Sequence, residues 1–487
     1  MPLRPRAWLA LLLVLVLLPL SAPVQAQAPY TATAGLLPVG PDPDAPTAEM
    51  FYVAYTRDGT DPAVRPVTFL FNGGPGAASV YLHLGAAGPR VLATPGDGRM
   101  PQAPAGLEDN PASWLDFTDL VFLDPVGTGY SRALAGGAAG SDRRGNARAF
   151  WDVRADLASI GQSMRLYLTR HERWESPKAI AGESYGGLRA AALTRVLAEE
   201  HDIVLNAAVL ISPALDLGLI DGGTRHALLP WATLLPSLAA TAAAHGRGEL
   251  PDGGLEAVED YALGPYLAGL GGIGRTAPET TGAFYAQVAA LTGLPVEEVA
   301  RRRGRVGSSD FAKLVLRPEG RVLDVYDGML AYPDPAPERE ELVGGSRSLR
   351  QSTALLGGAF PGYLEEATGW ESPLRYLVLN NEVRRRWSFA SGIDGEQGYV
   401  GTADDLAAAL SANEGLRVLV AHGRHDLVTP YLASRYLVDQ TVADPDARAR
   451  VAFATYDGGH MFYFHAASRD AFTADVSALF ATLGVVN

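Results

Sequence analysis

A serine with one glycine two positions before it and another two positions after it indicates acyl-transfer chemistry. Residues 182–187 read Gly-Glu-Ser-Tyr-Gly-Gly, which places Ser184 between these glycines. An apolar run precedes the segment, and residues 188–200 repeat apolar side chains at the three- and four-residue spacing of a helix. A strand, a sharp turn and a helix form a nucleophile elbow, which exposes the serine oxygen at the strand end. The pattern therefore predicts Ser184 as a nucleophile, although a Gly-rich turn with a helix-capping serine also fits it.

Two candidate partners for this serine follow the last two predicted strands. Residues 416–421 form an apolar run that leads to Asp426, and residues 450–456 lead to His460. The order Ser, Asp, His is that of the α/β-hydrolases, and each residue comes just past a strand end, where open parallel sheets place their sites. We therefore expect His460 to act as the general base and Asp426 to orient it. Asp457, three residues before His460, is the alternative acid.

Backbone N–H groups are needed to stabilise the oxyanion that forms when a serine attacks a carbonyl carbon. The residue after the nucleophile, Tyr185, is expected to supply one of them. A buried strand at 66–71 runs into Asn-Gly-Gly-Pro-Gly, so Gly73 or Gly74 is expected to supply the second. No Lys-Ser or Lys-Thr pair follows this loop, as a phosphate-binding P-loop would require. A simple Gly-Pro turn is the alternative for the loop taken alone.

Short apolar strands alternate with amphipathic helices along most of the chain. This alternation predicts a mostly parallel central sheet flanked by helices, which is the α/β-hydrolase fold of the α/β class. The predicted strands are 49–56, 66–71, 120–123, 178–181, 206–212, 416–421 and 450–456, and the predicted helices are 147–170, 188–200, 431–439 and 469–483.

The alternation stops in the middle of the chain. Residues 216–400 contain helical pieces, Gly-rich joints and a Pro-rich stretch, and we expect them to form a large cap insertion over the site. The core is then split into a first part, 27–215, and a second part, 401–487. Within the insertion, the three arginines at 384–386 are expected to form a solvated face, because exposed charge is common.

The composition excludes several classes of protein. A formal net charge of −14 over 487 residues argues against a nucleic-acid partner, which requires clustered Lys and Arg. The chain has no cysteine, which excludes a Cys nucleophile, disulfides and Cys-ligated metal sites. We expect neither a metal nor a cofactor.

Residues 1–26 have the features of a secretory signal peptide. Arg4 and Arg6 precede an apolar run at 9–20, and small residues follow it as far as Ala26. The run is shorter than the ~20 residues that a membrane-spanning helix needs. We therefore expect an exported protein, periplasmic or extracellular, with no stable membrane anchor after cleavage. An uncleaved anchor helix is the alternative.

Four segments together resemble the serine carboxypeptidase family, namely 72–76, 182–187, 422–426 and 459–461. Because the chain has no cysteines, it is similar to a bacterial-type member rather than to the disulfide-containing relatives from eukaryotes. The resemblance implies an enzyme that hydrolyses the C-terminal peptide bond of peptides with a free C-terminus. The reaction would proceed through an acyl-enzyme on Ser184.

The resemblance also implies roles for three further residues. Asn72 and Glu183 would bind the terminal carboxylate of the substrate, and Met461 would line the leaving-group side. A carboxylate repels a carboxylate, so Glu183 has to be protonated to donate a hydrogen bond. In the family, the residue that matches Glu183 shares its proton with a second Glu, but Ala86 stands at that position here and His83 is a nearby partial substitute. We therefore expect Glu183 to ionise more readily and the activity to depend differently on pH.

These features together predict a secreted serine carboxypeptidase. An alcohol can intercept the same acyl-enzyme, so an esterase or acyltransferase that uses the same three residues is the main alternative. A third possibility is a catalytically silent binding protein that has kept the α/β-hydrolase fold.

Overall fold

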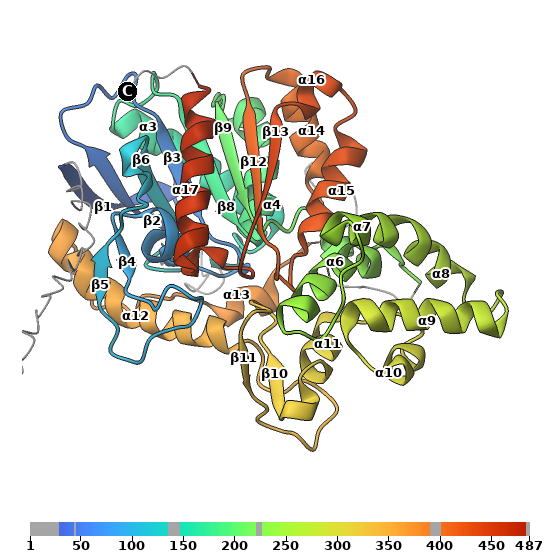
Figure 1. Ribbon diagram of the computed structural model, residues 1–487. Helices are drawn as coiled ribbons and strands as arrows, with labels where there is room; N and C mark the ends of the chain where they lie inside the picture. Colours follow the sequence, from blue (N-terminus) through green and yellow to red (C-terminus); the bar gives the residue numbers. More distant parts are fainter. Residues whose placement is uncertain (1–28, 43–44, 135–146, 221–225, 390–400, 484–487) are drawn as a thin grey trace, which may run out of the picture.

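The computed structural model describes residues 29–42, 45–134, 147–220, 226–389 and 401–483. Within these residues, nine strands form a central sheet (Figure 1). The strands from β6 to β13 in the spatial order below are parallel, whereas β1 and β2, at one edge, pair antiparallel. The spatial order is β1 (Tyr30–Val39), β2 (Ala48–Arg57), β6 (Asp119–Asp124), β3 (Val67–Phe71), β8 (Lys178–Glu183), β9 (Ala207–Ile211), β12 (Arg417–Gly423) and β13 (Val451–Tyr456), with β7 (Arg132–Ala133) beside β2. The predicted, mostly parallel sheet is confirmed.

The two faces of the sheet are buried in separate apolar clusters, because successive side chains of a strand point to opposite faces. In β6, Val121 and Leu123 belong to one cluster, whereas Leu120 and Phe122 belong to the other. The first cluster includes side chains of α3 (Val153–Arg170), α4 (Tyr185–Glu200) and α14 (Ala403–Ala412). The second includes side chains of α12 (Arg347–Thr368) and of α17 (Ala466–Ala481), which crosses the sheet in Figure 1. Helices therefore flank the sheet as predicted.

The long helix α3 begins at Val153, later than residue 147, where the apolar pattern predicts its start. Asp152 precedes the helix, and its carboxylate accepts a hydrogen bond of 3.0 Å from the N–H of Ala155. This contact satisfies one of the N–H groups that the first turn of a helix leaves free. The capping side chain, and not the apolar spacing, therefore sets the start of α3.

Between β9 and β12 the chain forms a helical lobe that packs beside the sheet. The lobe consists of α6 (Leu229–Ala244), α7 (Gly254–Tyr261), α8 (Leu267–Gly272), α9 (Pro278–Thr292), α10 (Val296–Arg301) and α11 (Ser308–Leu314). These helices share a third apolar cluster, to which Tyr431 and Leu432 of α15 (Tyr431–Thr441) also contribute. The lobe is therefore anchored to the sheet domain through α15 (Figure 1).

The remaining elements are short, and they connect the lobe to the core or lie at the ends of the sheet. They are α1 (Val80–Leu82), the π-helix η1 (His83–Ala87), β4 (Arg90–Leu92), β5 (Leu107–Asp109), η2 (Trp114–Asp116), α5 (Leu217–Ile220), η3 (Ala262–Tyr266), η4 (Arg317–Glu319), β10 (Arg321–Leu323), β11 (Ala331–Pro333), α13 (Asn381–Arg386), α16 (Pro445–Arg448) and η5 (Phe462–Phe464). None of the helices in the described residues combines the length and apolar character needed to cross a membrane. The predicted signal peptide, residues 1–26, lies outside the described residues.

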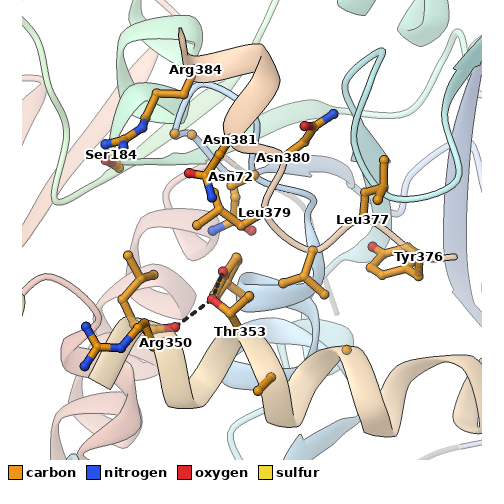
Figure 2. Close-up of a pocket in the computed structure, with 18 of the residues that line it drawn as sticks. Asn72, Ser184, Arg350, Thr353, Tyr376, Leu377, Leu379, Asn380, Asn381 and Arg384 are labelled. Carbon is orange, nitrogen blue, oxygen red and sulfur yellow. Dashed lines mark hydrogen bonds between the residues drawn. The ribbon is translucent and has the colours of Figure 1, made fainter. Parts of the chain in front are cut away.

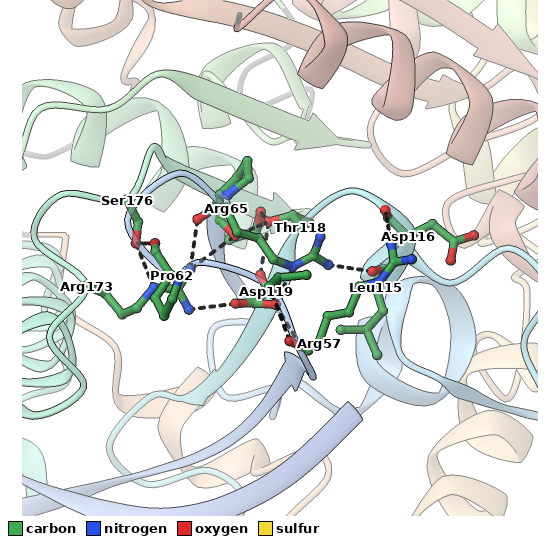
Figure 3. Close-up of polar contacts among 12 residues, drawn as sticks. Arg57, Pro62, Arg65, Leu115, Asp116, Thr118, Asp119, Arg173 and Ser176 are labelled. Atoms are coloured by element: carbon green, nitrogen blue, oxygen red, sulfur yellow. Dashed lines mark hydrogen bonds and ion pairs between the residues drawn. The ribbon is translucent and has the colours of Figure 1, made fainter. Parts of the chain in front are cut away.

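A buried aspartate ties together the N-terminal ends of the parallel strands (Figure 3). The carboxylate of Asp119, at the start of β6, accepts hydrogen bonds from Arg65 at 2.7 Å and from Arg173 at 2.6 Å. It also accepts a hydrogen bond of 3.0 Å from the backbone N–H of Arg57. Because β6, β3 and β8 are parallel, this cluster lies at the opposite end of the sheet from Glu183, which ends β8.

Candidate active site

Ser184 occupies the turn between β8 and α4. Its backbone has φ 61° and ψ −123°, a conformation that residues other than glycine rarely adopt. A Cβ on Gly182 would overlap the carbonyl oxygen of Gly186, so the turn requires a glycine at that position. Backbone strain of this kind costs about 1–3 kcal/mol and persists only where the surrounding structure holds it. The strand, sharp turn and helix that the sequence pattern predicts are present at Ser184.

His460 and Asp426 meet at the ends of two neighbouring parallel strands, β13 and β12. Nδ1 of His460 lies 2.7 Å from Oδ2 of Asp426, and both side chains are buried. The other carboxylate oxygen accepts hydrogen bonds from the backbone N–H groups of Val428 at 2.7 Å and of Thr429 at 3.0 Å. These contacts fix the carboxylate, so that it can hold the imidazole in one orientation.

Thr429 also contacts this pair through its side chain. The hydroxyl oxygen lies 2.6 Å from Oδ2 of Asp426 and 3.0 Å from Nδ1 of His460. Sequence reasoning missed this residue, although a threonine three residues after a loop aspartate fits the pattern of a turn held by the aspartate side chain. The alternative acid, Asp457, is exposed and pairs with Arg424. The structure therefore places Asp426, and not Asp457, against the imidazole.

The local charges favour protonation of His460. Burial lowers its pKa, but the charge of Asp426, the hydrogen bond to Asp426 and the charge of Glu183 together raise the pKa above its ordinary value. His422 and His425 are close to Asp426 in the sequence, and burial lowers the pKa of each to about 4. Both are therefore neutral near pH 7, and of the three histidines only His460 is held by a carboxylate hydrogen bond.

Ser184 and His460 line the same cavity, which has a volume of about 1170 Å³ (Figure 2). The other predicted site residues that line it are Asn72, Gly73, Gly74, Glu183 and Met461. Asp426 and Tyr185 do not line it. However, a Cβ on Gly73 would lie 2.5 Å from the backbone nitrogen of Tyr185, so the Gly-rich loop lies directly against the N-terminus of α4. The first N–H groups of a helix have no partner within the helix, so the donors expected for an oxyanion lie beside Ser184.

Glu183 is buried directly before Ser184 and is held by two hydrogen-bond donors. The side-chain amide of Asn72 donates to Oε2, and the hydroxyl of Tyr463 donates to Oε1 at 2.9 Å. Burial is the main influence on the pKa of Glu183 and raises it to about 7. The charge of His460 and the bonds from Tyr463 and Asn72 oppose this rise. Glu183 therefore exchanges its proton near neutral pH.

The structure corrects the expectation that His83 partly replaces a second glutamate. His83 is fully buried, lies 2.7 Å from the hydroxyl of Tyr55 through Nε2, and stacks on Phe122 with ring centroids 4.1 Å apart. Burial lowers the pKa of His83 to about 3, so it stays neutral. Ala86 is buried in an apolar cluster. The partner of Glu183 on this side is Tyr463, which sequence reasoning did not single out.

Arg384, Arg385 and Arg386 are all exposed, as the expected solvated face at 384–386 requires. Arg385 and Arg386 do not line the cavity, and Arg386 pairs with Glu382 one turn earlier in α13. Arg384 does line the cavity, and Figure 2 shows its side chain extending from α13 toward Ser184. A run of three arginines does not show in the sequence which of them lines a cavity, because this depends on how the helix is oriented in the folded protein.

Residues 23–217 match the family model described as serine carboxypeptidase. The match confirms the resemblance over the part of the chain that contains Asn72, Glu183 and Ser184. Asp426 and His460 lie beyond the matched residues, so their assignment rests on the geometry above. No curated protein sequence matches the chain significantly.

Several solved structures resemble this fold at low sequence identity. A proline iminopeptidase from Mycobacterium smegmatis is 16% identical with a TM-score of 0.40, and the alignment covers 93% of this chain and 98% of that one. A thermostable carboxyl esterase from Bacillus coagulans is 10% identical with a TM-score of 0.40 and coverages of 93% and 99%. A peroxisomal α/β-hydrolase from Saccharomyces cerevisiae is 10% identical with a TM-score of 0.35 and coverages of 95% and 91%.

The arrangement has the parts that a serine hydrolase of the α/β-hydrolase fold requires. A strained serine and a carboxylate-bound histidine share one cavity, and backbone N–H groups lie beside the serine. Among the described residues, no group of three or more His, Cys, Asp or Glu side chains is placed to hold a metal ion.

Proposed function

We propose that this protein is a serine carboxypeptidase that removes residues from the free C-terminus of peptides. The observation that carries the proposal is the pair of Asn72 and Glu183 directly beside Ser184, in the cavity that His460 also lines. A serine hydrolase needs no buried carboxyl group next to its nucleophile. A carboxyl group that exchanges its proton near neutral pH can, when protonated, donate a hydrogen bond to the terminal carboxylate of a substrate.

The reaction would proceed in two steps. His460 accepts the proton of the Ser184 hydroxyl while the serine oxygen attacks the carbonyl carbon of the last peptide bond. The N–H of Tyr185 and that of Gly73 or Gly74 stabilise the oxyanion. The protonated imidazole, which Asp426 holds and stabilises, gives its proton to the leaving amine, and the free amino acid departs from the acyl-enzyme.

Hydrolysis of the acyl-enzyme repeats the proton transfers with water. His460 accepts a proton from a water molecule that attacks the acyl carbon, and returns a proton to the Ser184 oxygen as the peptide acid leaves. Met461 would line the side on which the leaving residue sits. Residues 216–400 would act as a cap over the cavity, because α12 and α13 supply several of its lining residues.

The test compares paired N-blocked peptides that carry a free or an amidated C-terminus. The full chain without residues 1–26, and its Ser184→Ala variant, are incubated with each peptide, and the products are identified by mass spectrometry. We expect stepwise loss of residues from the free-carboxyl peptide alone, and no loss with the variant. Hydrolysis of a simple ester with no loss from either peptide would instead identify an esterase or acyltransferase. Failure to react with a fluorophosphonate would indicate a non-catalytic binding protein.

We also propose that the protein is exported to the periplasm or the medium after removal of residues 1–26. The basic start, the apolar run and the small residues before position 27 support this proposal. The N-terminal sequence of the protein recovered outside the cytoplasm should begin at or shortly after Gln27. An intact N-terminus that fractionates with membranes would contradict it.

A further inference from the structure

The cavity that contains Ser184 has a cationic lining, although the whole chain has a formal net charge of −14. Three arginines line it, namely Arg350 on α12, Arg375 in the segment before α13, and Arg384 on α13. Of the described residues that line it, only Glu183 is acidic, and its side chain is buried. Positive charges gathered around a concave, low-dielectric surface concentrate anions there.

None of these three arginines makes an ion pair with a carboxylate of the described residues. By contrast, Arg386 on the same helix pairs with Glu382 at 3.3 Å. The charge of Arg384 opposes the rise that burial causes in the pKa of Tyr326. The ring of Tyr326 in turn contacts the imidazole of His460 edge-on, with 5.0 Å between the ring centroids. The Arg384 guanidinium is therefore available to a ligand close to the imidazole of the site.

The wall that carries these arginines is fixed to the core rather than free to move. The hydroxyl of Tyr376 donates to Asp124 at 3.2 Å, and the side-chain amide of Asn380 donates to the carbonyl of Gly127 at 2.9 Å. On α12, the hydroxyl of Thr353 lies 2.6 Å from that of Tyr81 in the core. Because the backbone of this segment is held in this way, binding a ligand costs the conformational freedom of the exposed arginine side chains alone.

We propose that the cavity selects peptides with an acidic side chain, Asp or Glu, on the residue before the scissile bond, and that Arg384 binds this carboxylate. The inference rests on the proposed carboxypeptidase function. A guanidinium binds a carboxylate through two parallel hydrogen bonds, which gives both affinity and orientation. Arg350 and Arg375 add positive charge to the same cavity. At about 1170 Å³ the cavity exceeds the size typical of sites for small ligands, so it has room for several residues of a peptide.

The test uses N-blocked peptides that differ only in Glu or Gln at the penultimate position, so that the terminal carboxylate is constant. We expect the full chain without residues 1–26 to cleave the Glu peptide with a kcat/KM about tenfold higher or more, the gain expected from one charge-assisted hydrogen bond. Arg384→Gln should lower kcat/KM for the Glu peptide to about that for the Gln peptide, so that the preference disappears. Arg385→Gln is the matched control, because Arg385 is exposed on the same helix but does not line the cavity, and it should retain the preference.

The remaining outcomes separate this inference from the proposed function. Equal cleavage of both peptides by the unmodified protein would overturn the selection of acidic residues while leaving the carboxypeptidase in place. An equal loss on both peptides in Arg384→Gln would show that Arg384 binds the terminal carboxylate or supports the fold, and would also overturn the inference. Arg384→Lys, which keeps the charge, should preserve part of the preference, and added salt should reduce it. No cleavage of any peptide would contradict the proposed function itself.

Discussion

The hydroxyl of Tyr463 donates a hydrogen bond of 2.9 Å to the carboxyl group of Glu183, the residue directly before Ser184. The two residues are 280 positions apart in the chain. Tyr463 belongs to η5, which follows His460. Its ring packs closely against Gly85, since a Cβ added to that glycine would lie only 2.8 Å from the ring. A neutral donor therefore holds Glu183, where Ala86 replaces the second glutamate of the family and His83 was the expected partial substitute.

Tyr463→Phe should shift the pH dependence of peptide cleavage toward higher pH. The bond from Tyr463 favours the ionised carboxylate and lowers the pKa of Glu183, so its loss raises that pKa above about 7. The proposed function needs protonated Glu183, so cleavage falls as pH rises through the pKa of Glu183. In the variant, the pH at which this fall occurs should be about one unit higher or more. The measurement is kcat/KM for a free-carboxyl peptide between pH 5 and pH 9.

Two comparisons make this prediction specific to the Glu183 carboxyl group. Tyr456→Phe removes a tyrosine hydroxyl that bonds to Asp475, away from the cavity, and should leave the profile unchanged. An ester substrate without a free carboxylate should show no shift with Tyr463→Phe. Superimposable profiles of the unmodified protein and Tyr463→Phe on the free-carboxyl peptide would contradict the role of Tyr463.

Glu183→Gln should stabilise the fold at high pH relative to the unmodified protein. The folded pKa of about 7 is above the ordinary value of 4.5, so the folded state binds the proton more tightly and loses stability as pH rises from about 4.5 to about 7. Glutamine does not ionise and avoids this loss, which amounts to up to about 3 kcal/mol above pH 7. The measurement is urea unfolding at pH 4 and pH 8, and the advantage of the variant should grow between them. A constant difference would show that the pKa of Glu183 is not raised by folding.

Asp426→Asn should lower kcat by roughly 10³- to 10⁴-fold, because an amide neither fixes the tautomer of His460 nor balances its positive charge. The charge of Asp426 and its hydrogen bond both raise the pKa of His460, so the low-pH limb of the kcat/KM profile should also move to lower pH. Asp457→Asn is the control. Asp457 is exposed and pairs with Arg424, so its loss should leave kcat within a few-fold. A large loss of activity in Asp457→Asn alone would reverse the assignment of the acid.

Asp119→Ala should destabilise the protein without affecting the chemistry. The change leaves two buried guanidinium groups, those of Arg65 and Arg173, without their carboxylate, which costs about 3–5 kcal/mol of unfolding free energy. The cluster is at the opposite end of the sheet from Glu183, so activity per folded molecule should not change. Asp116→Ala, at a nearby exposed position, should cost less than about 0.5 kcal/mol. Equal unfolding midpoints for the two variants would refute the anchoring role of Asp119.

Much of the fold and several candidate residues could be predicted because they depend on local patterns. The strands and helices of the core follow from apolar spacing, and the turn at Ser184 follows from the glycines that its close contacts require. His460 and Asp426 could be named as candidates because each follows a strand that ends at the same edge of a parallel sheet. Spacing alone left Asp457 open, because the choice between two nearby carboxylates depends on how the loops after β12 and β13 fold.

By itself, the amino-acid sequence determined seven of the nine strands of the sheet, the turn at Ser184 and the Gly-rich loop, since each of these depends on spacing and steric limits within a few residues. The tertiary structure decided which partners meet. It placed Tyr463 rather than His83 on Glu183, added Thr429 to the pair of His460 and Asp426, and turned Arg384 toward the cavity. The contact of Thr429 with Asp426 is local, but that of Tyr463 with Glu183 and the orientation of Arg384 depend on the packing of the whole molecule and leave no local pattern in the sequence.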